Sequence, residues 1–308
     1  AAIDPDVRRI RINLYRVANN SQIINALVNA AKNGKKVSVV VELQARFDEE
    51  NNINVSEVLQ DAGVKVIFGF PGLKVHSKLI LISKRINGKT LHVAHVGTGN
   101  FHEKTATIYG DLSLLTADKR ITEECRKLFS FFENNYERHV YRHLIVSPYN
   151  NRTKIEKLIQ RETQNAKAGK KAWIQIKVNN LVDPGIIRRL YAASKAGVRI
   201  RMIVRGVCAL IPGVVGLSEN ISVTSIVGRF LEHARVLVFC NDGSPEYFIT
   251  SADLMARNLD HRIEVTVPIY DLKVQSELTE VFNIQHKDNL KARVIDANQK
   301  NNYVTVSR

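Results

Sequence analysis

Two segments of the chain carry the same pairing of a histidine with a basic residue. His76 and Lys78 lie within PGLKVHSKLILI, and His233 and Arg235 lie within GRFLEHARVLVF. Both segments are predicted to be buried strands, which would place the histidine and the base on one face. Charged groups on a buried face are costly unless they serve a function. Because an imidazole nitrogen can attack phosphorus while a cation holds the phosphoryl oxygens, we expect phosphoryl-transfer chemistry here.

A turn rich in small and hydroxyl residues follows each segment. The first turn, VGTGNFHE, contains Gly97, Gly99 and Asn100, and the second, ITSADLMARN, contains Ser251 and Asp253. Glycine lets the backbone turn tightly near a site. We expect Asn100 and Asp253 to orient the two histidines by hydrogen bonds. The same order of signals occurs twice, which indicates an internal duplication.

The hydrophobic periodicity predicts an α/β fold with right-handed crossovers. The duplicated units span 10–115 and 173–270, and Trp173–Val178 is expected to correspond to Ile10–Val17, with Lys177 in place of Arg16. The expected strands and helices of the first unit are Ile10–Val17, Ser21–Lys32, Val37–Leu43, Val55–Ala62, Val64–Phe68, the His76 segment and Thr90–Val96. The last stretch, Val274–Arg308, is expected to be a helix and a loosely packed tail.

We predict two similar domains, 1–143 and 144–308, that face each other across a shared site. A strand and a helix, Leu144–Ala166, precede the second unit, and almost nothing precedes the first. We therefore expect the first domain to be truncated at its start and the chain to be part of something longer.

Composition limits the partners of the protein. The chain has 308 residues, 44% of them hydrophobic, and a formal net charge of +15. A positive balance suits nucleic acid, anionic lipid or a phosphate polymer, and charge alone does not choose among them. Three well-separated cysteines show no disulfide or zinc spacing, which favours a reducing, cytoplasmic setting. No apolar run approaches the roughly 18 residues of a membrane-spanning helix.

The duplicated H-x-[KR] motif with its downstream turn resembles the phospholipase D superfamily, in which two halves share one site. Longer strings, among them LYRVANNS, VELQARFDE, HVGTGNFHE, YGDLSLLT and RGVCALIPG, resemble the catalytic half of long-chain polyphosphate kinases. Phosphodiesterases of the superfamily usually carry an acidic residue shortly after the motif lysine, where this chain has Ser83 and Cys240. That departure weakens the phosphodiesterase interpretation.

The resemblance implies reversible transfer of the ATP γ-phosphoryl group to the end of a polyphosphate chain. His76 would be the phosphohistidine nucleophile, and His233 the second catalytic histidine, which contacts the phosphate or exchanges a proton. Tyr109 and Arg205 match family positions that contact ATP, and Arg262 is a further candidate phosphate ligand. The residues expected to hold ATP or phosphate are Lys78, Tyr109, Arg205, His233, Arg235 and Arg262.

Magnesium is the cofactor that the resemblance implies. Arg16 and Arg46 lie just past predicted strand ends, where α/β sheets bind ligands. They match family positions that hold the nucleotide phosphate and its Mg²⁺, and since an arginine cannot itself ligate a cation, we interpret both as phosphate clamps beside the metal.

The implied partners are ATP, ADP and inorganic polyphosphate, with no nucleic acid. A full-length protein is expected to form a homo-oligomer, and attachment to the periphery of the inner membrane is left open. Two alternatives also stay open: a phospholipase D-type phosphodiesterase or nuclease, and a fragment that binds polyphosphate without turnover.

Overall fold

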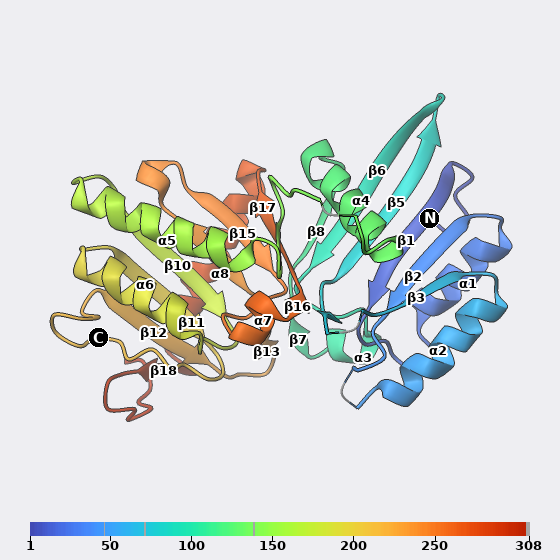
Figure 1. The fold of residues 1–308 in the computed structure, drawn as a ribbon. Helices are drawn as coiled ribbons and strands as arrows, with labels where there is room; N and C mark the ends of the chain where they lie inside the picture. Colours follow the sequence, from blue (N-terminus) through green and yellow to red (C-terminus); the bar gives the residue numbers. More distant parts are fainter. Residues whose placement is uncertain (46, 71, 138, 306–308) are drawn as a thin grey trace.

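The protein folds into two α/β lobes that lie side by side, with the N-terminus in one lobe and the C-terminus in the other (Figure 1). This computed structural model describes all residues except 46, 71, 138 and 306–308.

The first lobe contains a six-stranded sheet with the order β3-β2-β1-β5-β6-β8. Its strands are β1 (Val7–Leu14), β2 (Lys36–Val41), β3 (Lys65–Phe68), β5 (Leu79–Ile86), β6 (Lys89–Gly97) and β8 (Ser113–Thr116). Its helices are α1 (Gln22–Lys32), α2 (Glu49–Asp61), α3 (Glu103–Ala106) and α4 (Lys119–Glu133).

The second lobe contains an eight-stranded sheet with the order β18-β12-β11-β10-β14-β15-β17-β9. Its strands are β9 (Ile145–Val146), β10 (Trp173–Val178), β11 (Arg199–Val204), β12 (Ile221–Ile226), β14 (Val236–Phe239), β15 (Glu246–Thr250), β17 (Val265–Ile269) and β18 (Ala292–Ile295). Its helices are α5 (Asn151–Lys167), α6 (Pro184–Lys195), α7 (Ala256–Asp260), α8 (Leu272–His286) and the short 3-10 helix Asn241–Gly243.

The two sheets repeat one topology. The order β3-β2-β1-β5-β6-β8 corresponds strand by strand to β12-β11-β10-β14-β15-β17, and the second sheet adds an edge strand on each side. In both, the central strand pairs in parallel with one neighbour and antiparallel with the strand that follows the histidine motif. The predicted fold class, two similar α/β domains related by duplication, is confirmed. The domain boundary at 143/144 stays a prediction.

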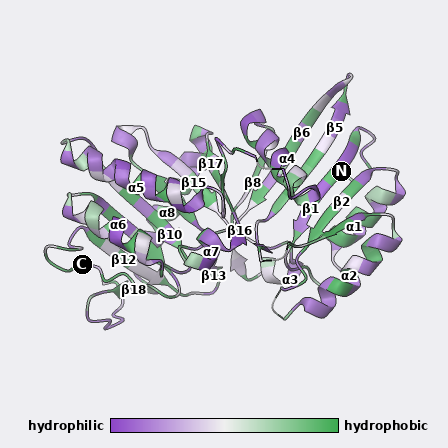
Figure 2. Ribbon diagram, in the orientation of Figure 1, coloured by the Kyte–Doolittle hydropathy of each residue, from purple (hydrophilic) through white to green (hydrophobic). Residues whose placement is uncertain are grey.

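Local signals explain why the elements form where they do. Ser21 caps α1 by accepting a hydrogen bond from the backbone N–H of Ile23, and Asp183 caps α6 in the same way through Ile186. The central strands β1 (VRRIRINL) and β10 (WIQIKV) alternate apolar and polar residues, whereas β2 (KVSVVV) is a mostly apolar run. Figure 2 shows β2 as largely hydrophobic and the helices with mixed surfaces.

One hydrophobic core spans both lobes. It contains Leu79 from the first sheet, Phe132 from α4, and Val236 and Val265 from the second sheet, all of them buried. The two halves are therefore packed against each other through apolar side chains, and this packing fixes how they face one another.

Some predicted elements differ from the structure. The first strand, β1, ends at Leu14 rather than Val17. Helix α2 begins at Glu49 rather than Val55. The C-terminal stretch is not only a helix with a loose tail, because β18 pairs with β12 and extends the second sheet.

Candidate active site

Both histidine motifs lie in breaks between strands, where the two halves meet. His76 follows β4 (Lys74–Val75) and Lys78 precedes β5, while His233 follows β13 (Leu231–Glu232) and Arg235 precedes β14. The short strand β4 pairs with β16 (Arg262–Ile263) of the second half, and β13 pairs with β7 (Tyr109–Gly110) of the first. The prediction of one continuous strand through each motif is wrong, because the chain changes partner there, from the opposite half to its own sheet.

A carboxylate from the second half fixes the ring of His76. Its Nδ1 lies 2.9 Å from Glu264 Oε1, and the Glu264 side chain is 0% exposed. The hydroxyl of Ser251 and the amide of Asn258 also donate to Glu264. Since Nδ1 is the nitrogen that faces the carboxylate, it carries the ring proton, and Nε2 keeps the lone pair needed for nucleophilic attack.

The environment of His76 keeps the imidazole neutral. Burial lowers the pKa of His76 to about 3, although Glu264 acts in the opposite direction. Burial likewise lowers the pKa of Lys78 to about 7, and its Nζ donates to the carbonyl oxygen of His76. A neutral, oriented imidazole beside an ammonium group is the arrangement that nucleophilic attack on phosphorus requires.

His233 has the reciprocal arrangement, with its carboxylate supplied by the first half. Its Nδ1 lies 2.8 Å from Asp111 Oδ1, and the hydroxyl of Thr98 donates to the same carboxylate at 2.6 Å. Arg235 Nη1 lies 3.2 Å from His233 Nε2 and donates to the carbonyl oxygen of Thr98 at 3.3 Å. Burial lowers the pKa of His233, partly offset by its hydrogen bond to Asp111.

The two centres therefore lie at the same interface between the halves and are built in the same way. Each half contributes a histidine to one centre and a carboxylate to the other. The charges of Glu264, Arg235 and Asp111 all act on the pKa of Lys78, which places both centres within electrostatic reach of each other.

Several cationic side chains lie near the Tyr15 ring, which contacts His76. The two rings meet edge to face, with centroids 4.7 Å apart. Among the described residues, three cationic groups lie within 6 Å of the Tyr15 ring centroid: Lys78 at 5.4 Å, Arg16 at 5.6 Å and Lys74 at 5.8 Å. Arg16 also forms an ion pair with Asp48, with Nε and Oδ2 2.8 Å apart. The predicted clamp Arg46 lies outside the described residues.

The other predicted phosphate ligands divide between the two centres. Arg262 lies beside His76, with its Nη1 4.0 Å from Glu264 Oε1. Tyr109 lies at the His233 centre, where the two ring centroids are 5.1 Å apart. Arg205 belongs to the same side, because its Nε donates to Asn179, whose amide donates to the carbonyl oxygen of His233. Burial and the charge of Arg235 lower the pKa of Arg205.

The sequence did not point to the orienting carboxylates. Asn100 and Asp253 were expected to orient the histidines, but Asp111 and Glu264 occupy those positions, and Asp253 instead bonds to Arg235 Nε at 3.2 Å. One signal was available: each acid lies thirteen residues after the hydroxyl residue that donates to it, Thr98 or Ser251.

The glycines of the first turn are needed for close approach. A Cβ on Gly99 would lie 2.2 Å from Asp111 Oδ2, and a Cβ on Gly97 would lie 2.8 Å from Cε1 of His95. The backbone can therefore reach the Asp111 carboxylate only where a side chain is absent.

Comparison with known families agrees with this geometry. A family model described as Polyphosphate kinase C-terminal domain 1 matches residues 1–138, and one described as Polyphosphate kinase C-terminal domain 2 matches residues 144–308. The chain belongs to the polyphosphate kinase family.

Individual relatives are similar over almost the whole chain. The polyphosphate kinase of Vibrio parahaemolyticus is 58% identical over 304 residues, which cover 99% of this chain and 44% of that protein. The polyphosphate kinase of Escherichia coli K12 is 51% identical, with the same two coverages. The chain thus spans less than half the length of these curated relatives.

Solved structures agree with the fold. The polyphosphate kinase from Porphyromonas gingivalis superimposes with a TM-score of 0.91 and 44% identity, over 98% of this chain and 46% of that one. A phosphatidylserine synthase from Haemophilus influenzae superimposes with a TM-score of 0.57 at 12% identity, over 95% of this chain and 83% of that one, a likeness of fold alone.

Cationic side chains, and not a cluster of metal-binding side chains, surround His76 among the described residues. Among them, no group of three or more His, Cys, Asp or Glu side chains is placed to hold a metal ion. The charged side chains nearest His76 include Lys78 and Arg262, which repel cations and attract phosphate oxygens. The carboxylates of Glu264 and Asp111 are already engaged with the histidines.

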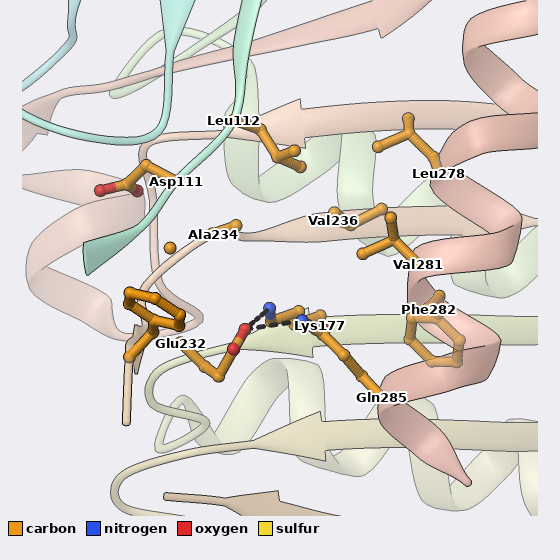
Figure 3. A pocket seen from close by; sticks show the side chains of 12 residues that line it. Asp111, Leu112, Lys177, Glu232, Ala234, Val236, Leu278, Val281, Phe282 and Gln285 are labelled. Carbon is orange, nitrogen blue, oxygen red and sulfur yellow. Dashed lines mark hydrogen bonds and ion pairs between the residues drawn. The ribbon is translucent and has the colours of Figure 1, made fainter. Parts of the chain in front are cut away.

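A cavity of about 220 Å³ adjoins the His233 centre, between α8 and the β7–β13 pair. Figure 3 shows Leu278 and Phe282 projecting from α8 toward it. On the cavity wall, Glu232 accepts hydrogen bonds from Lys177 at 2.6 Å and from Gln285 at 2.7 Å (Figure 3). This network holds β13, which precedes His233, against the core of the second half.

Lys177 does not occupy the position that the sequence suggested. It pairs with Val236, the residue directly after the motif base Arg235. In the first half, the residue after the motif base is Leu79, whose backbone N–H donates to Asn13 Oδ1. Lys177 therefore corresponds to Asn13 and not to Arg16.

Proposed function

We propose that this chain is the catalytic half of a polyphosphate kinase, which transfers the ATP γ-phosphoryl group to polyphosphate through a phosphohistidine. The observation that carries the proposal is the state of His76: a neutral ring, 12% exposed, whose Nδ1 is tied to Glu264. Because the chain spans 44% of the length of its relatives, the activity is proposed for this half and not inferred from theirs.

The first step forms a bond between His76 Nε2 and the γ-phosphorus of ATP and breaks the bond from that phosphorus to the bridging oxygen. ADP leaves with the bonding electron pair. Lys78 and Arg262 offset the negative charge of the phosphoryl oxygens, which is the main demand of phosphoryl transfer. In the second step a terminal polyphosphate oxygen attacks the same phosphorus, and His76 leaves as the neutral imidazole.

His233 acts on the oxygen atoms that lie on the side of the phosphorus opposite His76. Asp111 fixes its Nδ1, and its Nε2 lies 3.2 Å from Arg235 Nη1. It contacts the transferring group and exchanges a proton with the entering or departing oxygen. Mg²⁺ bound to ATP would offset part of the charge of its phosphate oxygens, and Arg16 would hold those phosphates beside the metal.

The setting of the protein is part of the proposal. The three free cysteines support a reducing cytoplasm, and the net charge of +15 suits an anionic polymer or a peripheral contact with anionic lipid. None of the helices in the described ranges is long and apolar enough to span a bilayer. The family resemblance implies a homo-oligomer for a full-length protein.

The test is incubation of the 308-residue chain with ATP labelled at the γ-phosphate. We expect an acid-labile, alkali-stable phosphate on the protein, lost in His76→Ala and kept in His92→Ala. His92 is a matched control because its Nδ1 bonds to Ser83 within the first sheet, away from both centres. Cleavage of DNA or lipid without label would favour the phosphodiesterase, and polyphosphate binding without label would favour the binding fragment.

A further inference from the structure

Corresponding positions of the two halves carry different side chains next to the two histidines. Ile12 pairs with Ile80, two residues after Lys78, and Ile176 pairs with Leu237, two residues after Arg235. Three residues beyond these isoleucines, the first half has Tyr15 and the second half has Asn179. The position is thus equivalent by register, and only its chemistry differs.

Asn179 is buried and forms hydrogen bonds to three residues of the His233 centre: Arg205, His233 and Asp253. The side chain is 2% exposed. Its Oδ1 accepts a hydrogen bond from Arg205 Nε at 2.9 Å, and its Nδ2 donates to the carbonyl oxygen of His233 at 3.2 Å. Its backbone N–H donates to Asp253 Oδ1 at 2.9 Å. The amide therefore links the end of β11 directly to the second histidine motif.

We propose that Asn179 is a positioning residue, which sets the guanidinium of Arg205 relative to His233 so that both meet the phosphates of ATP. The inference rests on the proposed function, because it takes the ligand to be ATP. A guanidinium binds phosphate through two parallel N–H bonds. The contact with Asn179 engages only Nε, and so orients the plane of the group toward a phosphate bound by the terminal nitrogens.

An amide is suited to this task because it donates and accepts at once. A carboxylate at position 179 keeps the acceptor for Arg205 but offers no donor to the His233 carbonyl. An aliphatic side chain offers neither. Asn179→Asp and Asn179→Leu therefore separate the two contacts, and Tyr15 shows that the fold itself does not require an amide at this position.

The experiment is a double-mutant cycle on ATP affinity, read as the Kd of the 308-residue chain for ATP. Asn179→Leu is expected to raise Kd about tenfold, as for loss of a hydrogen bond to a charged group. In an Arg205→Ala background the same change is expected to alter Kd less than twofold, since its partner is absent. Asn179→Asp is expected to raise Kd less than Asn179→Leu while lowering kcat.

Gln175→Leu is the matched control, because Gln175 is a buried amide within β10, four residues before Asn179, whereas the hydrogen bonds to Arg205 and to the His233 carbonyl come from Asn179. We expect it to leave Kd and kcat unchanged. Equal effects of Asn179→Leu with and without Arg205, or an equal loss of affinity in Gln175→Leu, would overturn the positioning role. If Asn179→Leu does not fold, the Asn179→Asp cycle with Arg205→Ala decides by the same criterion.

Failure of the proposed function gives a different result. If the wild-type chain neither binds ATP nor takes up label at His76, the proposed function is wrong, and the positioning role loses its premise. If the wild-type chain binds ATP but the effects of the Asn179 and Arg205 substitutions on Kd are additive, only the role of Asn179 is ruled out.

Discussion

The His76 centre and the His233 centre are built from the same parts but differ in their surroundings. In both, a carboxylate from the opposite half holds Nδ1, and a hydroxyl from the following turn holds the carboxylate. The side chain of Glu264 is 0% exposed, whereas that of Asp111 is 21% exposed. The two halves therefore share one geometry but differ in how deeply the carboxylate is buried, which fits the proposed division between a nucleophile at His76 and a phosphate-binding partner at His233.

The second difference concerns the neighbouring groups. His76 lies against the ring of Tyr15, and its motif base is a lysine with a strongly lowered pKa. His233 lies beside Arg235 and Tyr109, and Arg235 is a permanently charged base. Under the proposed function, the surroundings of His76 suit a neutral attacking group, and those of His233 suit phosphate binding by fixed positive charge.

Exchanging the two carboxylates for amides tests this division, and it has the largest expected effect. Glu264→Gln is expected to lower the rate of His76 labelling on the order of 10³-fold, because the amide no longer fixes the tautomer with Nε2 free to attack. Asp111→Asn is expected to lower kcat by about 10²-fold, as for loss of an acid–base partner, with a smaller effect on labelling. Single-turnover labelling and steady-state synthesis measure the two steps separately.

Glu123→Gln provides the control for this pair. Its carboxylate forms an ion pair with Arg126 on the exposed surface of α4, so neither rate is expected to change. If Asp111→Asn reduced labelling more than Glu264→Gln does, the nucleophile would have to be assigned to the His233 centre.

The sequence predicted most of the fold because its signals are local. Strand β10 matches its predicted residues, Trp173–Val178, since alternation and turn residues act over a few positions. The motif histidines were found because the motif occurs twice. The orienting carboxylates were missed because they lie 188 and 122 residues from their histidines, and such contacts depend on how the halves dock.

The breaks in the strands at the two histidine motifs were also missed because they depend on how the halves dock. PGLKVHSKLILI reads as one strand when only its own half is considered, yet β4 bonds to the second half and β5 to the first. The structure places Arg205 and Tyr109 at the His233 centre, and their roles as ATP ligands stay predictions. Asn179 had no local signal to distinguish it from any other strand-end amide.

Gly99 and Ala252 give a second, smaller test of the comparison. Each follows the hydroxyl residue that holds the carboxylate, so the two positions correspond. Gly99→Ala would place a Cβ 2.2 Å from Asp111 Oδ2 and displace the carboxylate from His233. We expect kcat to fall about 10²-fold, as for a displacement of about 1 Å at a site, with His76 labelling less affected.

Ala252→Gly is the matched reverse change in the second half. We expect its kcat to stay within about twofold and its melting temperature to fall slightly, because glycine adds freedom to the unfolded chain. Full activity in Gly99→Ala would show that the Asp111–His233 contact is dispensable, and the two centres would then be less alike in function than in structure.

Substitutions of the two basic motif residues, Lys78 and Arg235, have the smallest expected effect, which is a change in the pH dependence of kcat/KM. Burial lowers the pKa of Lys78 from 10.5 to about 7, so the ammonium loses its proton as the pH rises through 7. The protonated fraction, and with it kcat/KM, is expected to fall roughly fivefold between pH 7 and pH 8. His76 stays neutral above its pKa of about 3 and adds no change in this range. Lys78→Arg should flatten the alkaline decline, because a guanidinium keeps its charge.

The second half offers the reverse substitution. Arg235 is buried and bonds to Asp253 and to the carbonyl oxygen of His233, so the corresponding lysine would occupy a site of similar depth. Arg235→Lys is expected to steepen the decline above pH 7, and the slope can be compared even if its absolute rate is lower. An alkaline decline that persists unchanged in Lys78→Arg would assign the titration to another group. The lysine would then contribute to the His76 centre through packing rather than through charge.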